Sequence, residues 1–348
     1  MDSIFLKACK RQPVEYTPVW LMRQVGRYLP QYRKIRNKYG FGMMYKTPSI
    51  ASELTVAAVE TLDVDAAIIF SDLLVVPEAV GCPVTYTKED GPVLEKCISN
   101  DADVEKLRNE ECVYEIDYVY EAIKMTKKML PSDVPLIGFA GAPWTMAAYM
   151  IDGHHNSGFR KVCSLIKGSP AFLFNLLERL TSTVCQFVIK QIESGADAIM
   201  LFDTWGEVLS PLTYRKLSLP YVKQIIENTR NFKIPIILYT RSSKKLFKVL
   251  LESGADVIGI DSSIDIGTAR KLSKEQVAIQ GNLDPSVLYK SKSHIHSNVR
   301  KILKGFGGGT GHIFNLSQGV PKDVPVSNVK ELIKFVKQES VVYHGNQT

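Results

Sequence analysis

Two arginines stand four residues apart directly after the first apolar run of the chain, in TPVWLMRQVGRYLPQYRK (residues 17–34). Arg23 and Arg27 flank Gly26, and two more basic residues follow within the same stretch. A guanidinium group stays charged and can grip a carboxylate through two parallel hydrogen bonds. The spacing therefore indicates a site for an anionic ligand, although a solvated basic start of a helix would explain the same charges.

Polar residues follow other apolar runs of the sequence in the same way. Asp72 stands in SDLL, and Asp203 and Thr204 stand in DTWG. The others are Trp144, Tyr149, Thr240, Arg241, Asp261, Asp284 and Gln318. These groups would form one polar rim if the runs were neighbouring parallel strands. We expect Asp203 and Asp261 to hold this rim together by pairing with arginines.

Eight short apolar runs carry these residues. Each run is continuously apolar rather than alternating, as expected for strands that are buried on both faces. The runs span residues 17–22, 64–70, 135–140, 197–202, 234–239, 256–260, 277–282 and 312–316. Between them lie stretches with helical periodicity, for example 49–62, 171–195 and 242–254. The last two end in Ser-Gly, which is typical of a helix stop.

This alternation of strand and helix predicts the α/β class and a single (β/α)8 TIM barrel. A doubly wound open sheet is the second possibility. Segment 84–96, with its Asp-Gly turn, predicts a hairpin inserted after strand two. No linker divides the chain, so we expect one domain over residues 1–348, with a poorly constrained C-terminal tail from about residue 339. In a TIM barrel the functional residues follow the C-terminal ends of the strands, where the rim residues stand.

The composition limits the partners and the compartment. Lys and Arg total 43 against 36 Asp and Glu, and no polybasic tract occurs, which favours a small anionic ligand over nucleic acid. We find no signal-peptide pattern and no long uninterrupted apolar stretch, so we expect a cytoplasmic protein without a membrane span. The six cysteines form no CxxC pair and should be reduced. Adjacent His154 and His155 would point apart in regular structure, so we predict no metal site.

Five segments together resemble the uroporphyrinogen decarboxylase family: PVWLMRQVGRYLPQYR, AAIIFSDLLVVPEAVG, GFAGAPWTMAAYM, LFDTWG and QGNLDP. The resemblance extends from about residue 3 to residue 338. It implies a (β/α)8 barrel, commonly a homodimer, that works without a cofactor. It also implies a substrate, uroporphyrinogen III, whose four acetate groups lose CO₂ to give coproporphyrinogen III.

The resemblance further implies a role for each rim residue. Asp72 would hydrogen-bond the pyrrole NH groups and stabilise the cation that forms when a ring carbon is protonated and the ring accepts the electrons of decarboxylation. Arg23 and Arg27 would bind substrate carboxylates, and Arg23 is the more plausible of the two for delivering the proton. The remaining implied binding residues are Gln24, Val25, Gly26, Tyr149, Thr204 and Gln318.

The sequence departs from the family pattern at several positions. NLSQG places Gln318 where relatives carry a histidine, and glutamine can donate a hydrogen bond but carries no charge. GIDSS (259–263), DGHHNSGF (152–159) and RQVGR also differ from the family pattern. A non-catalytic or impaired tetrapyrrole-binding paralogue is therefore an alternative. A zinc- and corrinoid-dependent methyltransferase is a further one, but its His-x-Cys pattern is missing from LYTRSS (238–243).

Overall fold

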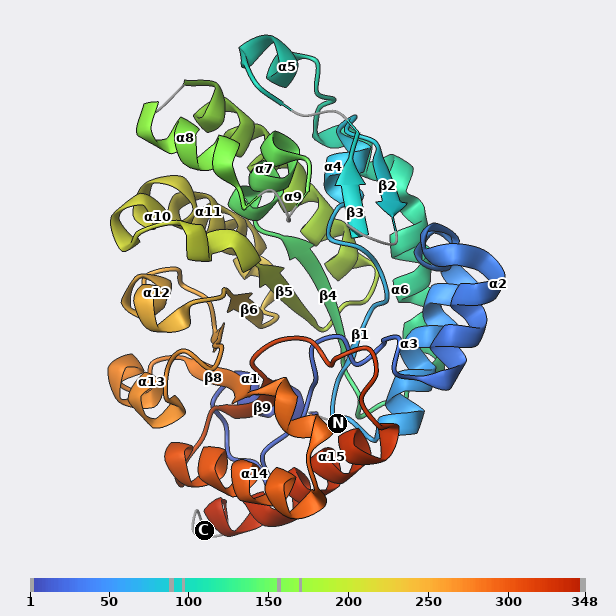
Figure 1. Cartoon of the computed structure of the whole chain (residues 1–348), viewed down its shortest axis with the longest axis vertical. Helices are drawn as coiled ribbons and strands as arrows, with labels where there is room; N and C mark the ends of the chain where they lie inside the picture. Colours follow the sequence, from blue (N-terminus) through green and yellow to red (C-terminus); the bar gives the residue numbers. More distant parts are fainter. Residues whose placement is uncertain (1–2, 88–90, 96–97, 155–157, 169–170, 345–348) are drawn as a thin grey trace.

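The computed structural model describes residues 3–87, 91–95, 98–154, 158–168 and 171–344. A curled sheet of parallel strands lies at its centre, in the order β1-β4-β5-β6-β7-β8-β9 (Figure 1). The strands are β1 (Ala67–Ile68), β4 (Leu136–Gly141), β5 (Ala198–Phe202), β6 (Ile236–Tyr239), β7 (Val257–Gly259), β8 (Ala278–Leu283) and β9 (His312–Leu316). Seven of the eight predicted runs thus form parallel strands in chain order.

The first predicted run closes the barrel between β9 and β1. Val19 forms a parallel bridge with Phe314, and the Phe314 N–H donates to the carbonyl of Pro18 at 2.8 Å. On the other side, the N–H of Asp65 donates to the carbonyl of Val19, and a carboxylate oxygen of Asp65 accepts from the Val19 N–H at 2.7 Å. The segment is shorter than a regular strand, yet it completes the eight-membered ring, so the predicted (β/α)8 barrel is confirmed.

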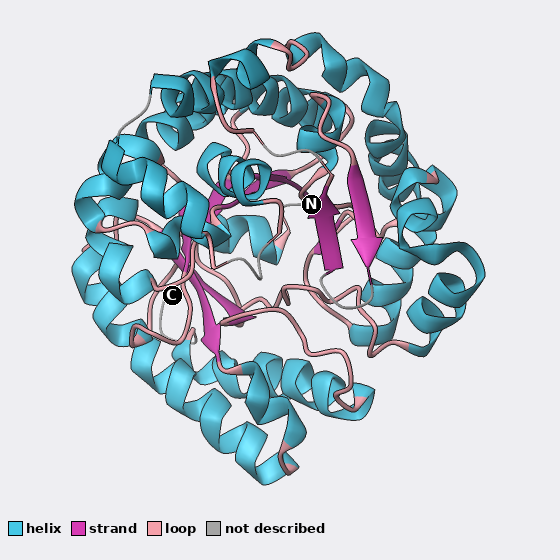
Figure 2. Ribbon diagram, turned by 45° about the horizontal axis from the view of Figure 1, so that its top comes forward, coloured by secondary structure: helices cyan, strands magenta, loops and turns pink. Residues whose placement is uncertain are grey.

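Helices form the outer layer around the strands (Figure 2). The α-helices are α1 (Ile4–Cys9), α2 (Pro30–Lys46), α3 (Pro48–Leu62), α4 (Val75–Ala79), α5 (Asp101–Glu105), α6 (Asp117–Met129), α7 (Pro143–Asp152), α8 (Arg160–Gly168), α9 (Ala171–Glu193), α10 (Pro211–Leu217), α11 (Leu219–Thr229), α12 (Ser243–Leu250), α13 (Ile266–Ser273), α14 (Lys292–Phe306) and α15 (Val326–Ser340). The 3₁₀ helices are η1 (Glu110–Ile116), η3 (Thr204–Val208), η4 (Arg230–Phe232), η5 (Pro285–Tyr289) and η6 (Val341–Tyr343). Apolar side chains between this layer and the strands form one hydrophobic core cluster.

Helix α9 is long and apolar enough to cross a membrane by length and composition. Its apolar side chains Leu176, Leu180 and Val184 are fully buried within the core cluster. Burial inside the protein already accounts for this composition, as is common for a central helix of a large fold.

An antiparallel pair of strands, β2 (Val84–Thr87) and β3 (Gly91–Leu94), follows β1 and α4. The turn between them, residues 88–90, lies outside the described residues, and so does Asp90 of the predicted Asp-Gly turn. The Leu94 N–H donates to the carbonyl of Gly153 at the end of α7. The hydroxyl oxygen of Tyr86 lies 3.1 Å from that of Tyr45 in α2, within hydrogen-bond distance. The pair is therefore packed between two helices and does not project from the barrel.

Helical structure continues past residue 339, where we expected the C-terminal tail to begin. Helix α15 runs to Ser340 and η6 to Tyr343, and only residues 345–348 lie outside the description. The Ser340 hydroxyl oxygen accepts from the N–H of Thr17, and Nε2 of His344 lies 2.9 Å from the Thr17 hydroxyl oxygen. These contacts attach the C-terminal helices to the segment that closes the barrel.

Candidate active site

Arg23, Asp72 and Tyr149 come together at the C-terminal ends of the strands. Burial raises the pKa of the Tyr149 hydroxyl, and the charge of Asp72 adds to this rise. The charges of Arg23 and Arg241 act on the same hydroxyl and lower its pKa. Side chains from four different barrel segments therefore share one electrostatic environment, as the predicted rim requires.

Arg23 stands in a tight loop that buried hydrogen bonds hold in place. Its φ of 60° lies in the left-handed region, which a non-glycine residue rarely adopts. The Gln24 side chain accepts from the Leu21 N–H and donates to the carbonyl of Ala66, and it is fully buried. Gln24 can therefore contribute only its backbone to a ligand, while its side chain fixes the loop that presents Arg23.

Arg27 is not brought to the same place by the described contacts. Its side chain is exposed, and only its carbonyl has a described partner, the guanidinium of Arg33. Val25 packs against the hydrophobic core, and Gly26 lies half-buried. The described contacts therefore leave the Arg27 side chain exposed to solvent, without an assigned partner in the candidate site.

Gln318 lies on the loop that contacts Arg23. A methyl group added at the next residue, Gly319, would come within 2.4 Å of Cδ of Arg23. The loop therefore lies directly against the arginine side chain, and Gln318 is exposed beside it. Its carboxamide is available to a ligand at the rim.

Asp72 is a half-buried carboxyl with a strongly shifted proton affinity. Burial raises its pKa to about 6, and the charge of Glu78 adds to the rise. The Leu74 N–H, which donates to Oδ1 at 2.7 Å, lowers the pKa together with the charge of Arg23 and the Tyr86 hydroxyl. Asp72 is therefore ionised at neutral pH, but it gains a proton under mildly acidic conditions.

Within the described residues, neither Asp203 nor Asp261 forms an ion pair with an arginine, so that prediction is wrong. Asp203 is fully buried and accepts from the hydroxyls of Thr145 and Ser218, at 2.8 and 2.6 Å. Asp261 accepts from the backbone N–H groups of Ser242 and Ser243. Both carboxylates do hold the ends of strands together. Nearby hydroxyl and backbone N–H groups supply their hydrogen bonds, so the arginines of the rim have other partners.

Thr204 begins η3 directly after β5 and is half-buried. No described contact joins its hydroxyl to Arg23, Asp72 or Tyr149. The neighbouring ring of Trp205 lies edge-on to Tyr149, with 5.9 Å between centroids. Thr204 is therefore next in sequence to a residue that contacts Tyr149, but its own hydroxyl has no described contact with the site.

Three aromatic rings from the adjacent strands β4, β5 and β6 pack against one another. Phe139 and Phe202 are 5.7 Å apart between centroids, and Phe202 and Tyr239 are 6.1 Å apart. The Tyr239 hydroxyl donates to the carbonyl of Ser317 at 2.9 Å, across the barrel from β6 to the loop after β9. A barrel mouth that offers both charged groups and apolar rings suits a large ring with charged substituents.

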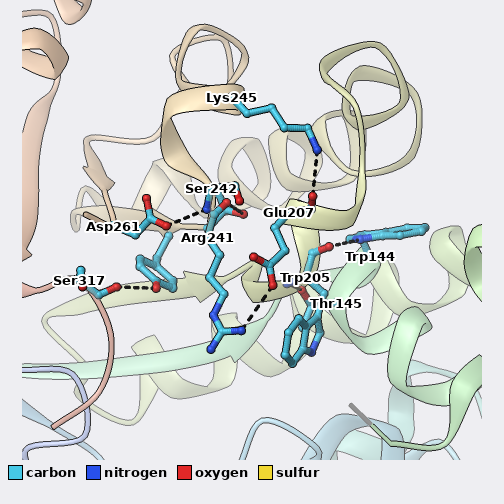
Figure 3. Close-up of polar contacts among 11 residues, drawn as sticks. Trp144, Thr145, Trp205, Glu207, Arg241, Ser242, Lys245, Asp261 and Ser317 are labelled. Carbon is cyan, nitrogen blue, oxygen red and sulfur yellow. Dashed lines mark hydrogen bonds and ion pairs between the residues drawn. The ribbon is translucent and has the colours of Figure 1, made fainter. Parts of the chain in front are cut away.

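Two features of the site were not predicted. Tyr86 comes from the antiparallel pair, and only the packing of this pair against α2 brings its hydroxyl near Asp72. Arg241 was placed at the rim without a role. Its guanidinium contacts Glu207 and lies over the ring of Trp205, 5.0 Å from the centroid (Figure 3).

A separate groove between α13 and α14 has a volume of about 660 Å³. Its arginine, Arg270, already donates to the carbonyls of Phe306 and Gly308 and to the carboxylate of Glu275. These contacts explain the arginine as a brace for the end of α14. Within the described parts of the chain, no three His, Cys, Asp or Glu side chains are grouped so that they could hold a metal ion.

Comparison with known proteins points to one family along nearly the whole chain. Residues 2–339 match the family model of uroporphyrinogen decarboxylase (URO-D). The uroporphyrinogen decarboxylase of Chlorobaculum parvum is 42% identical over 348 residues, covering 99% of both chains. That of Legionella pneumophila is 40% identical over 346 residues, covering 99% of this chain and 98% of the relative.

Among solved structures, a methyltransferase from Methanosarcina mazei matches with a TM-score of 0.81 and 18% identity, covering 97% of this chain and 99% of the other. Identity at this level shows a shared fold and nothing more. The segment Leu238–Ser243 carries no His or Cys, so the zinc ligands expected of the methyltransferase alternative are missing there.

Proposed function

Because the chain belongs to the uroporphyrinogen decarboxylase family, we propose that it removes CO₂ from the four acetate groups of uroporphyrinogen III to give coproporphyrinogen III. This proposal is supported by Arg23, Asp72 and Tyr149 following three neighbouring barrel segments at the same end of the barrel, where the charges of Arg23 and Asp72 both act on the Tyr149 hydroxyl. These are the groups that a polyanionic pyrrole substrate requires. The alternative of a non-catalytic tetrapyrrole-binding paralogue has less support, because all three groups are retained together.

The proposed reaction uses the substrate ring as the electron sink. A proton adds to the pyrrole ring carbon next to the one that bears the acetate, and the ring becomes a cation in which the acetate-bearing carbon is conjugated with the positively charged nitrogen. The bond between the acetate methylene and its carboxylate then breaks, CO₂ leaves, and the electron pair neutralises the ring. A proton adds to the methylene carbon to form the methyl group, and the ring carbon releases its proton, so that each acetate consumes one proton and yields one CO₂.

Asp72 would stabilise the cationic ring in this sequence. An ionised carboxylate that accepts from the pyrrole NH groups becomes more favourable as positive charge develops, which is preorganised electrostatic stabilisation. Arg23 would hold a substrate carboxylate and is placed to act in proton delivery. The other proposed binding groups are the backbone of Gln24, Val25 and Gly26, and the side chains of Arg27, Tyr149, Thr204 and Gln318.

The proposal has a direct test. The purified protein is incubated anaerobically with uroporphyrinogen III, and the products are separated by their number of carboxylates. Products with seven, six, five and finally four carboxylates are expected. Tight binding of the substrate without release of CO₂ would favour the paralogue instead.

The rate should depend on pH through Asp72. Because its pKa is about 6, we expect kcat/KM to fall as the pH decreases through 6, as Asp72 becomes protonated and loses its charge. The Tyr86 hydroxyl lowers this pKa, so Tyr86→Phe should move the acidic limb to higher pH. Steady-state rates between about pH 5 and 8 measure both effects. An acidic limb that stays in place in Tyr86→Phe would contradict the assignment.

The contact between Gly319 and Arg23 gives a second prediction. Gly319→Ala should lower kcat/KM about tenfold, because the new methyl group must displace the arginine side chain from its position. The fold should persist, since Gly319 is not in a left-handed conformation. Gly42→Ala is the matched control, because a methyl group there meets no atom within 4 Å. Equal activity of the two variants would show that the position of Arg23 is unimportant.

We further propose that the enzyme works without a cofactor, as a homodimer in the cytoplasm, and that it binds neither nucleic acid nor membrane. Membership of the family supports the first two statements. The modest net charge of +7 without a polybasic tract supports the absence of a nucleic-acid partner. Light scattering of the purified chain would establish whether it is a dimer.

A further inference from the structure

Arg241 is a partly exposed guanidinium at the rim. It follows β6, and about a third of its side chain is exposed. Its Nη1 lies 3.4 Å from Oε1 of Glu207, which is long for a hydrogen bond between charged groups. The Trp205 ring supports one face of the guanidinium, and Figure 3 shows the arginine extending past the Glu207 carboxylate to reach it. The Tyr239 hydroxyl also hydrogen-bonds the guanidinium, and these contacts orient the group while leaving some of its five N–H donors for a ligand.

The topology places Arg241 across the barrel from Arg23. The ring of barrel segments runs from the Val19 segment through β1, β4 and β5 to β6, so β6 is the fifth of eight. Arg23 follows the first segment and Arg241 follows the fifth, which is opposite in an eight-membered ring. Tyr149 follows β4, between them, and its hydroxyl is influenced by both charges. The two guanidiniums thus flank the same space from opposite sides.

We propose that Arg241, oriented by Trp205 and Glu207, binds a second carboxylate-bearing side chain of the macrocycle on the far side of the barrel mouth from Arg23. The inference rests on the proposed function. A cyclic tetrapyrrole carries carboxylates around its whole edge, so a ring held by Arg23 on one side presents others on the opposite side. A partly exposed ion pair contributes little free energy. Arg241 can therefore bind a substrate carboxylate beside Glu207, or in its place, with only a small loss of free energy.

Glu207 and Trp205 have separate tasks in this subsite. Glu207 balances the charge of Arg241 when no substrate is bound. Its backbone carbonyl accepts a hydrogen bond from the Lys245 ammonium, which helps to hold it in place. Trp205 fixes the plane of the guanidinium, which a two-point contact with a carboxylate requires. The carboxylate itself could belong to an acetate or to a propionate, and the two can be distinguished by experiment.

The test compares Arg241→Gln with Arg300→Gln. Both variants lose an arginine from an Arg–Glu pair, but Arg300 pairs with Glu339 on the outer helices α14 and α15. Arg241→Gln should raise KM for uroporphyrinogen III about tenfold or more, with kcat nearly unchanged, because the contact is made in both the bound substrate and the transition state. The dependence of KM on salt should also become shallower. Arg300→Gln should match the wild type, and Arg241→Lys should recover only part of the loss.

Binding of coproporphyrinogen III, which has lost its acetates, identifies the side chain. If Arg241→Gln has a larger Kd for this product than the wild type, Arg241 binds a propionate. If the Kd is unchanged but the KM for uroporphyrinogen III is raised, Arg241 binds an acetate. If the wild type converts uroporphyrinogen III and Arg241→Gln has the same KM and Kd as the wild type, the inference about Arg241 is overturned and the proposed function stands. A wild type that binds coproporphyrinogen III but releases no CO₂ would refute the proposed function alone, and one that binds neither tetrapyrrole would overturn both.

Discussion

Asp72→Asn should lower kcat by about 10²- to 10³-fold and leave the folded protein at least as stable as the wild type. The loss of rate follows from removing the charge that faces the cationic ring, an effect of the size measured for single preorganised groups in other active sites. The side chain keeps its size, and its oxygen can still accept from the Leu74 N–H. The loss should therefore appear in the chemical step and not in the fold.

The sign of the stability change follows from the raised pKa. Burial raises the pKa of Asp72 to about 6, so between about pH 4 and 6 the folded chain binds more protons than the unfolded chain. The free energy of unfolding contributed by this group therefore falls as the pH rises through that window, and it stays low at neutral pH. Asparagine removes this penalty, so the melting temperature at pH 7 to 8 should equal or exceed that of the wild type.

Asp203→Asn is the matched control, because Asp203 is also buried and its pKa is also raised by burial. Removing the charge relieves the cost of burial here as it does at Asp72. However, the two oxygens of Asp203 accept from separate hydroxyls and an amide NH₂ cannot accept, so the melting temperature should be lower than that of Asp72→Asn. Thermal unfolding by circular dichroism and anaerobic single-turnover rates separate the two variants. A wild-type rate in Asp72→Asn, or a larger loss of stability there than in Asp203→Asn, would refute the assigned role.

Arg23→Gln should lower kcat/KM by about 10- to 100-fold and also change the pH dependence of the reaction. The first effect is the loss of charge-assisted hydrogen bonds to a substrate carboxylate. The second arises because the charge of Arg23 lowers the pKa of Asp72, so its removal should raise that pKa and shift the acidic limb of the rate profile to higher pH. A residue with only a structural role would not move this limb.

Arg27→Gln is the comparison for this prediction. Arg27 is exposed, and its side chain has no described contact with Asp72. Its loss should raise KM, with a smaller effect at high salt, where its attraction for the substrate is already screened. The acidic limb should stay where it is. If both arginine variants shift the limb equally, the separation of their roles is wrong.

The sequence allowed the barrel to be predicted because its strands are buried on both faces. Such strands are continuous apolar runs, and their order along the chain is their order around the ring. The rim followed from the same logic, since a residue after a parallel strand lies at a known end of the barrel. Asp72, Arg23 and Tyr149 were predicted to lie at the rim in this way.

Other features depend on contacts that no local pattern encodes. The buried side chain of Gln24 braces the loop of Arg23 because Ala66 and Leu21 happen to lie beside it. Asp203 accepts from hydroxyls on α7, 58 residues away, and just before α11, 15 residues away, where we expected arginines. Direction and partner of a polar side chain are set by packing, and packing is decided by the whole chain.

The antiparallel strands β2 and β3 bear on how this enzyme can be modified. Because Tyr86 on β2 tunes the proton affinity of Asp72, the pair cannot be treated as a surface decoration that is free to be shortened. Grafting this pair from a relative whose tyrosine is absent should change the working pH range of the recipient, even though no residue of the grafted piece takes part in the chemistry.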